Sequence, residues 1–156
     1  MQLSEHFHLA EFTSSQEATR RGIDNTPSEE VISNLVELCI NVLEPIRISW
    51  NAPLVISSGY RSRELNDAVG GSQSSQHIYG EAADFEIFGV DNCELAGWIA
   101  DYLMFDQLIL EFHQHGSDPN SGWVHASYSA TKKNRLEVFT AKKNAGRTIY
   151  LPGLRT

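Results

Sequence analysis

The sequence predicts an α+β fold in which helices pack on one face of a small, mainly antiparallel sheet. Two segments, residues 26–44 and 91–103, begin with capping motifs and then carry apolar residues at helical spacing. Shorter segments are β-branched or alternate between apolar and polar residues, and a run of turn formers separates two of them. No linker or repeat interrupts the 156 residues, so we expect one domain over residues 1–156.

Two helices are expected to supply the apolar layer. Residues 26–29, Thr-Pro-Ser-Glu, combine a capping box with proline at the first helical position. The helix that they start is expected to end at about residues 43–44, because Pro45 follows. Asp-Asn-Cys-Glu at residues 91–94 repeats the capping pattern and starts a helix that reaches about Leu103.

Shorter elements lie between and after these helices. Residues 54–58 are β-branched and predict a buried strand, and residues 63–69 predict a short helix that two glycines close. Residues 82–87 predict a second strand, on which alternation directs Asp84 away from the more apolar face. The C-terminal stretch, residues 132–156, is expected to form a strand followed by a tail, without an assigned function.

A hairpin is expected where residues 107–113 and 122–128 flank a run of turn formers. If its centre lies near Asp118, Glu111 faces His125 directly, although a centre displaced by one residue would offset the pair. Alternation places one mixed face opposite one apolar face. The mixed face carries Ile109, Glu111, His113, Trp123, His125 and Ser127, and the apolar face carries Leu108, Leu110, Phe112, Val124, Ala126 and Tyr128.

Three residues predict a metal site. His77 and Asp84 flank a turn that contains Gly80, and His125 lies on the predicted hairpin. Two imidazoles and one carboxylate leave the fourth position of a tetrahedral Zn²⁺ open, as hydrolytic zinc requires. We therefore expect a zinc hydrolase, with the metal on the sheet face opposite the helices.

Composition excludes several other classes. Twenty acidic and twelve basic side chains give a net charge of -8, which argues against nucleic acid bound through its phosphates. No apolar run is long enough for a membrane span, and the N-terminus carries no recognisable secretion signal. We expect a monomer that is synthesised in the cytoplasm.

Four further residues could bind metal but are not expected to do so. Cys39 and Cys93 have no nearby Cys or His partner, and they are expected to be free thiols. His113 and His115 form an H-x-H pair that could share a metal from alternate strand positions. We expect solvent-exposed or supporting roles for these two histidines instead.

Three motifs resemble a known family when they are taken together. They are S-x-H-x-x-G-x-A-x-D at residues 75–84, W-V-H at 123–125 and S-G-Y-R-S at 58–62. They resemble the zinc peptidases that include bacterial D-Ala-D-Ala carboxypeptidases, vancomycin-resistance dipeptidases and phage L-alanyl-D-glutamate endolysins. The hedgehog signalling domain is a relative, so the resemblance also implies a hedgehog-like α+β fold.

The resemblance implies a role for each matching residue. His77, Asp84 and His125 would ligate zinc, Arg61 would bind the substrate carboxylate or polarise the scissile carbonyl, and Ser75 would add a polar contact. The alternative, purely structural roles are a surface ion pair for Arg61 and a turn cap for Ser75. All three motifs occur in the family's order, which favours the site.

The general base is the position at which this sequence departs from the family. The dipeptidases carry an acid three positions before the last histidine, but this chain has Gly122 there. We predict that Glu111 is the base, because the hairpin geometry places it near His125. Its alternative role is an ion pair, and Asp106, Asp118 and Glu86 are rival bases.

The resemblance implies a peptidoglycan hydrolase that cleaves stem peptides. Either an L-Ala-D-Glu endopeptidase or a D,D-carboxypeptidase fits, in a phage or prophage enzyme that is released by a holin or carried in a virion. The alternative is a zinc-containing binding or virion structural module that keeps the fold without turnover.

Overall fold

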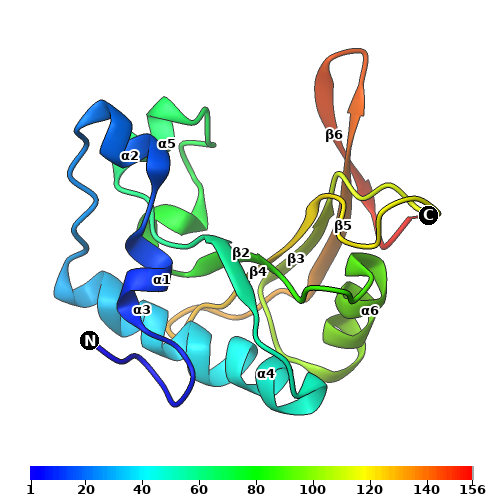
Figure 1. Cartoon of the computed structure of the whole chain (residues 1–156), viewed down its shortest axis with the longest axis horizontal. Helices are drawn as coiled ribbons and strands as arrows, with labels where there is room; N and C mark the ends of the chain where they lie inside the picture. Colours follow the sequence, from blue (N-terminus) through cyan, green and yellow to red (C-terminus); the bar gives the residue numbers. More distant parts are fainter. Residues whose placement is uncertain (156) are drawn as a thin grey trace.

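The computed structural model describes residues 1–155 and has the predicted α+β architecture (Figure 1). Its sheet has six strands in the order β1-β2-β4-β3-β5-β6, and all neighbours are antiparallel except β3 and β5. The strands are β1 (Val55–Ser58), β2 (Ala82–Glu86), β3 (Gln107–Glu111), β4 (Trp123–Ser127), β5 (Glu137–Asn144) and β6 (Arg147–Pro152).

The helical segments differ in position, and those that carry core residues close the core against one side of this sheet. The segments are α1 (Leu9–Thr13), α2 (Gln16–Arg21), α3 (Glu29–Leu38), η1 (Cys39–Leu43), α4 (Glu44–Trp50), α5 (Arg63–Ala68), η2 (Gln76–Tyr79) and α6 (Asn92–Tyr102). Helices α3, α4 and α6 lie below the strands in Figure 1, and Leu35 and Ile99 pack in one core with Val124. The predicted arrangement of helices against the sheet is therefore confirmed.

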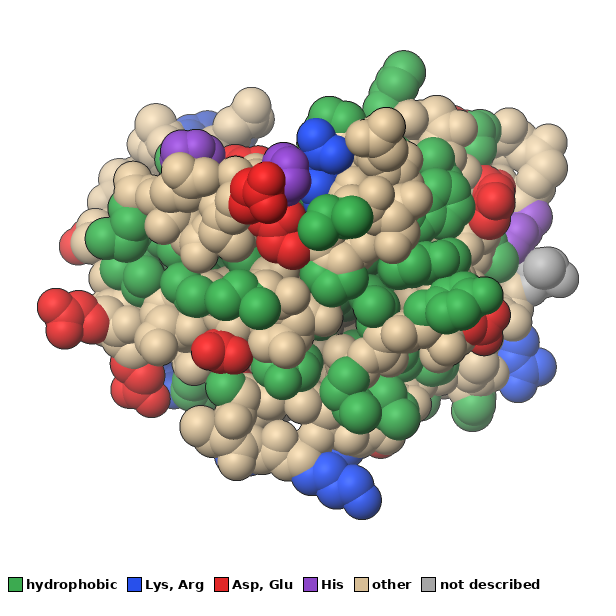
Figure 2. All heavy atoms as spheres, turned by 90° about the horizontal axis from the view of Figure 1, so that it is seen from below, with side chains coloured by type: hydrophobic (Ala, Val, Ile, Leu, Met, Phe, Trp, Pro, Cys, Tyr) green, Lys and Arg blue, Asp and Glu red, His purple; other side chains and the backbone are tan. Residues whose placement is uncertain are grey.

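The outer side of these helices is mixed in character (Figure 2). Apolar side chains reach the surface there among polar ones, and the exposed ones on these helices include Ile40, Ile48 and Tyr102. Over residues 1–155, no helix combines the length and the apolar character needed to span a membrane. Cys39 and Cys93 are free, as the sequence predicted.

The first long helix differs from the prediction at both ends. Ser28 rather than Thr26 is the N-cap, and its hydroxyl accepts a hydrogen bond from the backbone N–H of Val31. The helix also does not end before Pro45, because α3 continues through the π-helical turn η1 into α4. Pro45 lies in the first turn of α4, where its missing N–H is tolerated after the change in hydrogen-bond pattern.

The prediction of a buried first strand was wrong. Strand β1 forms at the expected place, but it lies at the sheet edge and pairs with β2 alone, and 51% of Val55 is exposed. A β-branched run predicts strand geometry without stating how many neighbours the strand has. The predictions for α5 and for α6, which Asp91 caps, are confirmed.

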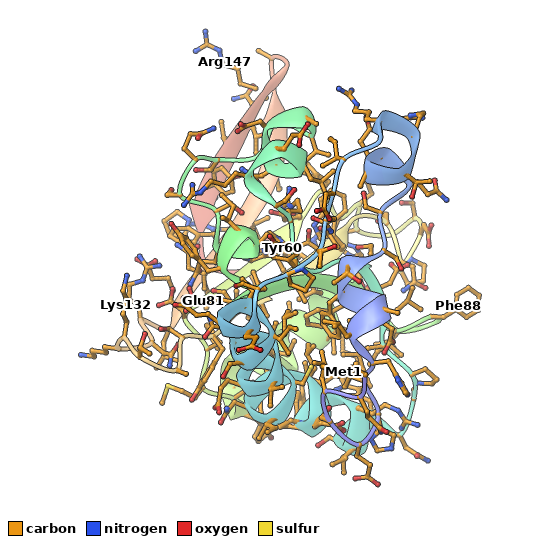
Figure 3. The ribbon with its side chains drawn as sticks, turned by 90° about the vertical axis from the view of Figure 1, so that its left-hand side faces the viewer. Met1, Tyr60, Glu81, Phe88, Lys132 and Arg147 are labelled. Atoms are coloured by element: carbon orange, nitrogen blue, oxygen red, sulfur yellow. The ribbon has the colours of Figure 1, made fainter. Side chains whose placement is uncertain are left out.

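The C-terminal stretch is a hairpin rather than a strand followed by a tail. Strands β5 and β6 are joined at Ala145 and Gly146, which both have positive φ, as two-residue hairpin turns require. Alanine seldom adopts this conformation, so the turn has a weak sequence signal. The hairpin projects from the rest of the protein, with Arg147 at its tip (Figure 3), and β5 joins the sheet beside β3 in parallel.

Candidate metal centre

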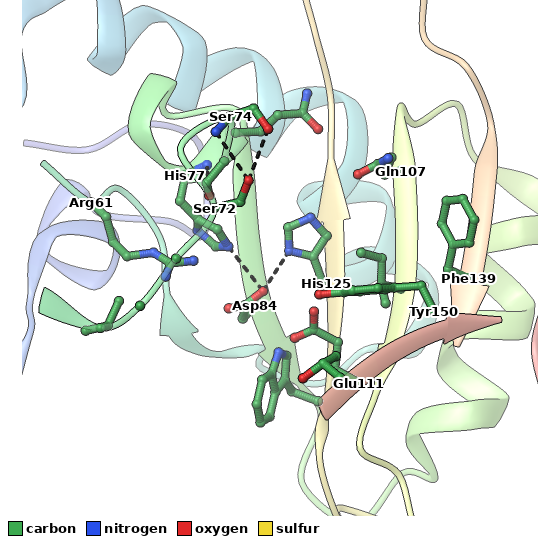
Figure 4. Close-up of a pocket in the computed structure, with 18 of the residues that line it drawn as sticks. Arg61, Ser72, Ser74, His77, Asp84, Gln107, Glu111, His125, Phe139 and Tyr150 are labelled. Carbon is green, nitrogen blue, oxygen red and sulfur yellow. Dashed lines mark hydrogen bonds and ion pairs between the residues drawn. The ribbon is translucent and has the colours of Figure 1, made fainter. Parts of the chain in front are cut away.

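The three predicted ligands lie together on the sheet face opposite the core (Figure 4). One ligand atom from each of His77, Asp84 and His125 lies within 4.8 Å of the other two. The residues come from three elements, η2, β2 and β4, so the site forms only when the chain folds. Asp84 and His125 are direct partners in the pairing of β2 with β4.

Two local contacts orient the ring of His77. Ser75 caps η2, and its hydroxyl accepts a hydrogen bond from the backbone N–H of His77. The ring Nδ1 of His77 lies 2.6 Å from the carbonyl oxygen of Gly59, which can only accept, so Nδ1 carries the proton. The lone pair of Nε2 is therefore free on the side of Asp84, where Nε2 lies 3.4 Å from Oδ1.

The charges of the three residues suit a divalent cation. Burial lowers the pKa of His77, which keeps its imidazole neutral. Burial by itself would raise the pKa of Asp84, but contacts with His77 and His125 outweigh it and hold the pKa below its usual value. Neutral nitrogen and ionised oxygen donors are the forms that zinc binds. Burial would lower the pKa of His125, but contact with Asp84 outweighs it and raises that pKa, so a metal would displace a proton from this ring when it binds. The donor set of two histidines and one carboxylate fits a metal.

The pairing of β3 with β4 differs from the prediction: each residue of β3 pairs with a residue two positions earlier in β4 than expected. His125 pairs with Ile109, and Glu111 pairs with Trp123, so Glu111 is diagonal to His125 instead of facing it. The centre lies one residue before Asp118, and a shift of this size moves each partner by two residues. Since side chains alternate with a period of two, Glu111 still shares the sheet face of His125.

Two residues that follow β3 depart from the predicted alternation. Phe112 has a φ of 57°, which interrupts the strand, and its ring packs against Trp123 on the site face, with centroids 5.4 Å apart. The predicted faces of Phe112 and His113 were therefore wrong. His113 is buried away from the site, with Nδ1 3.0 Å from the carbonyl oxygen of Ser121 and Nε2 3.3 Å from a carboxylate oxygen of Asp91.

The other histidine of the H-x-H pair lies outside the site as well. His115 is exposed, and its Nε2 lies 2.9 Å from the carbonyl oxygen of Arg155. Neither His113 nor His115 lines the cavity over the three grouped residues, and His113 is more buried than expected.

A cavity of about 850 Å³ opens over the three ligands. Besides the ligands, residues Arg61, Ser75 and Glu111 line it, so it gathers all the predicted site residues. Asp84 and Glu111 are the acids that line it within the described part of the chain. The rival bases have other surroundings: Asp118 and Glu86 do not line the cavity, and Asp106 forms an ion pair with Arg135.

Glu111 has the environment of a group that can exchange a proton near neutral pH. Burial raises its pKa to about 7, and the negative charge of Asp84 adds to the shift. General bases work best when their pKa lies near the operating pH. On the other side of the ligands, burial lowers the pKa of Arg61, and its Nε has no hydrogen-bond partner among residues 1–155.

Sequence reasoning missed one wall of the cavity. Phe139, Thr148 and Tyr150 of the C-terminal hairpin line it, together with the loop that follows α5. The alternation of Thr148 and Tyr150 placed them on one face of a strand. It did not say which strand lay beside them, because β5 joins β3 over a long stretch of chain.

The absence of a side chain at residue 122 has a structural cause. Gly122 has a φ of +67°, and a Cβ there would lie 1.9 Å from the carbonyl oxygen of Glu111. We expect Gly122→Ala to lower the free energy of unfolding by at least about 2–3 kcal/mol, because strain and a backbone clash add. Urea denaturation measures this loss.

Gly116→Ala is the matched control for this substitution. Gly116 has a φ of +78° but open space where its Cβ would lie, so we expect only the cost of strain, about 1 kcal/mol. Equal losses at Gly116 and Gly122 would show that the close approach to Glu111 is unimportant. An acid therefore cannot occupy residue 122 without moving the backbone at the end of β3.

Comparison with known proteins agrees with this geometry. A family model described as Peptidase M15 matches residues 5–117, which include Arg61, His77, Asp84 and Glu111 but end before His125. A search of curated proteins finds no match. The match covers well over half of the chain, and the His-Asp-His group supplies the expected kind of metal site. The chain therefore belongs to the peptidase M15 family of zinc peptidases.

Proposed function

We propose that this protein is a zinc metallopeptidase that hydrolyses peptide bonds in peptidoglycan stem peptides. Its family supports peptide hydrolysis, and the grouping of His77, Asp84 and His125 supports a bound metal. The observation that carries the proposal is the half-buried carboxylate of Glu111 in the same cavity, with a pKa raised to about 7. A site that only bound metal would not need this group.

His77, Asp84 and His125 would hold the metal in this proposal. When bound, Zn²⁺ supplies a Lewis acid that acidifies water and polarises a carbonyl group. Glu111 would accept the proton of the attacking water and return it to the leaving amine, which its pKa allows near neutral pH. Among residues 1–155, Asp84 is the other acid that lines the cavity, and it is not available as the general base because it contacts both histidines.

Arg61 would hold the substrate beside the reacting bond. Arg61 is half-buried, lines the cavity and has an unpartnered Nε among the described residues, so its guanidinium can bind a carboxylate in bidentate fashion or a developing oxyanion. Ser75 also lines the cavity, but its hydroxyl already accepts a hydrogen bond from the N–H of His77. We propose that Ser75 acts first as a cap that orients His77 and only secondarily as a substrate contact.

A digest of purified cell walls identifies which peptide bond is cleaved. Mass spectrometry of the muropeptides separates the two reactions, because an L-Ala-D-Glu endopeptidase leaves new L-Ala ends and a D,D-carboxypeptidase releases D-Ala. We expect one of these two products. Unchanged muropeptides after treatment with the zinc-loaded protein would contradict the peptidase proposal and favour a binding or virion structural module.

The biological setting proposed for this activity is cell-wall lysis by a phage or prophage. A monomeric enzyme made in the cytoplasm would reach the wall through holin-type release or as part of a virion. Lysis assays on intact cells and on cells with permeabilised membranes would distinguish an enzyme that needs release from one that acts from outside.

A further inference from the structure

Register across four strands places one residue of the C-terminal hairpin in line with the proposed base. Trp123 pairs with Glu111, Glu111 with Ala141, and Ala141 with Tyr150. These four residues form a row across β4, β3, β5 and β6, on the sheet face that carries the metal ligands. Two strand spacings separate Glu111 from Tyr150, which corresponds to about 10 Å between their Cα atoms.

The residue between them leaves space for the tyrosine side chain. Ala141 has only a methyl group, so the ring of Tyr150 can lie over β5 toward the ligands. Figure 4 shows this arrangement: Tyr150 extends from β6 with its hydroxyl directed toward His125 and Glu111. The negative charge of Glu111, after burial, contributes to raising the pKa of Tyr150, which agrees with their proximity.

The tyrosine lies across the cavity from Arg61. In Figure 4, Arg61 is on one side of His77, Asp84 and His125, and Tyr150 and Phe139 are on the other. All of them line the same cavity, and 56% of Tyr150 is still exposed. A peptide with its reacting bond at the ligands and one end at Arg61 must therefore run toward the hairpin. The family match ends at residue 117 and does not account for this wall.

We propose that Tyr150 contacts the substrate and contributes to its selection. Arg61 holds the peptide on one side of the cleaved bond, and Tyr150 contacts the segment on the other side. The ring of Tyr150 offers an apolar surface to the peptide, and its hydroxyl offers a hydrogen bond to a backbone amide. Phe139 provides the apolar floor beside it. This inference rests on the proposed peptidase function and adds a specificity-determining contact to it.

Binding of an uncleaved peptide tests the contact without depending on turnover. The probe is a synthetic stem peptide, L-Ala-γ-D-Glu-L-Lys-D-Ala-D-Ala, titrated by calorimetry into the zinc-loaded Glu111→Gln protein. Adding Tyr150→Phe should weaken binding about 2- to 10-fold, because one hydrogen bond is lost. Adding Tyr150→Ala should weaken it further, about 5- to 30-fold, because the ring contact is lost as well.

Tyr102→Ala in the same background is the matched control, since Tyr102 is 71% exposed on α6 and does not line the cavity. Zinc content and thermal unfolding should be the same for the two Tyr150 variants and their parent. Equal affinity of the Tyr150→Ala and Tyr102→Ala proteins would overturn the contact, as would failure of the peptide to bind the Glu111→Gln protein.

The experiments distinguish a failure of the Tyr150 contact from a failure of the proposed peptidase function. If the peptide binds in the manner expected but the Glu111-intact protein does not cleave it, the contact stands and the peptidase proposal fails. If cleavage occurs and Tyr150→Ala leaves both affinity and KM unchanged, the peptidase proposal stands and the contact is overturned.

Discussion

Glu111→Gln is expected to slow hydrolysis of cell-wall peptides by about 10²- to 10⁴-fold, the range for loss of a general base. Glutamine keeps the shape of the side chain but cannot accept the proton of the attacking water. The zinc content should stay unchanged, because Glu111 is not among the three grouped ligands. The measurement is the rate of release of muropeptide fragments, together with clearing of a cell-wall zymogram.

Glu86→Gln is the matched control for this experiment. Glu86 ends β2, two residues beyond Asp84, but it does not line the cavity, so we expect a rate close to that of the unmodified protein. Equal clearing by the Glu111→Gln protein and the unmodified protein would remove Glu111 from the mechanism. Clearing by neither would favour the non-catalytic module on the same fold.

Asp84→Asn should abolish stoichiometric zinc binding. The unmodified protein is expected to carry about one equivalent of zinc when it is purified without a chelator. The variant should carry less than about a tenth, because a neutral amide replaces the ionised oxygen that lies between His77 and His125. Elemental analysis measures the metal directly.

Stability provides a second measurement for the same variant. Zinc at a thousand times its dissociation constant should stabilise the unmodified fold by about 4 kcal/mol, and the midpoint of thermal unfolding should fall when a chelator is added. The Asp84→Asn protein should show little response to the chelator. Asp101→Asn on α6 is the control, since Asp101 is exposed and is not grouped with the ligands. An unmodified protein with less than about a tenth of an equivalent of zinc would contradict the metal assignment.

The hairpin between β3 and β4 shows which features a local sequence pattern predicts and which it does not. Alternation placed Glu111 and His125 on one face, and this prediction is confirmed by the register. The direct pairing was wrong because the turn formers between the strands did not define its centre to one residue. The break at Phe112, with its positive φ, has no sequence signal, since the conformation is rare for an aromatic residue.

The second wall of the cavity could not be predicted from any single segment of the sequence. Strand β5 lies parallel to β3, and this pairing brings Tyr150 into the row of Glu111. Parallel neighbours are joined by long connections, so their pairing leaves no short-range pattern in the chain. The exposure of β1 was mispredicted for a related reason, because the position of a strand within a sheet depends on all the other strands.

The sequence by itself predicted the donor residues of the candidate metal centre. The spacing of His77 and Asp84 around the Gly80 turn, with His125 on a strand, predicted the three residues that the structure groups, because the motif specifies residue types and local geometry together. The sequence also favoured Glu111 over its rivals, but only the tertiary structure showed that Glu111 lines the cavity while Glu86 and Asp118 do not, and what lies opposite Arg61. Glu111 and Tyr150 reach the cavity through strand pairings between distant segments, and such pairings depend on the packing of the whole sheet.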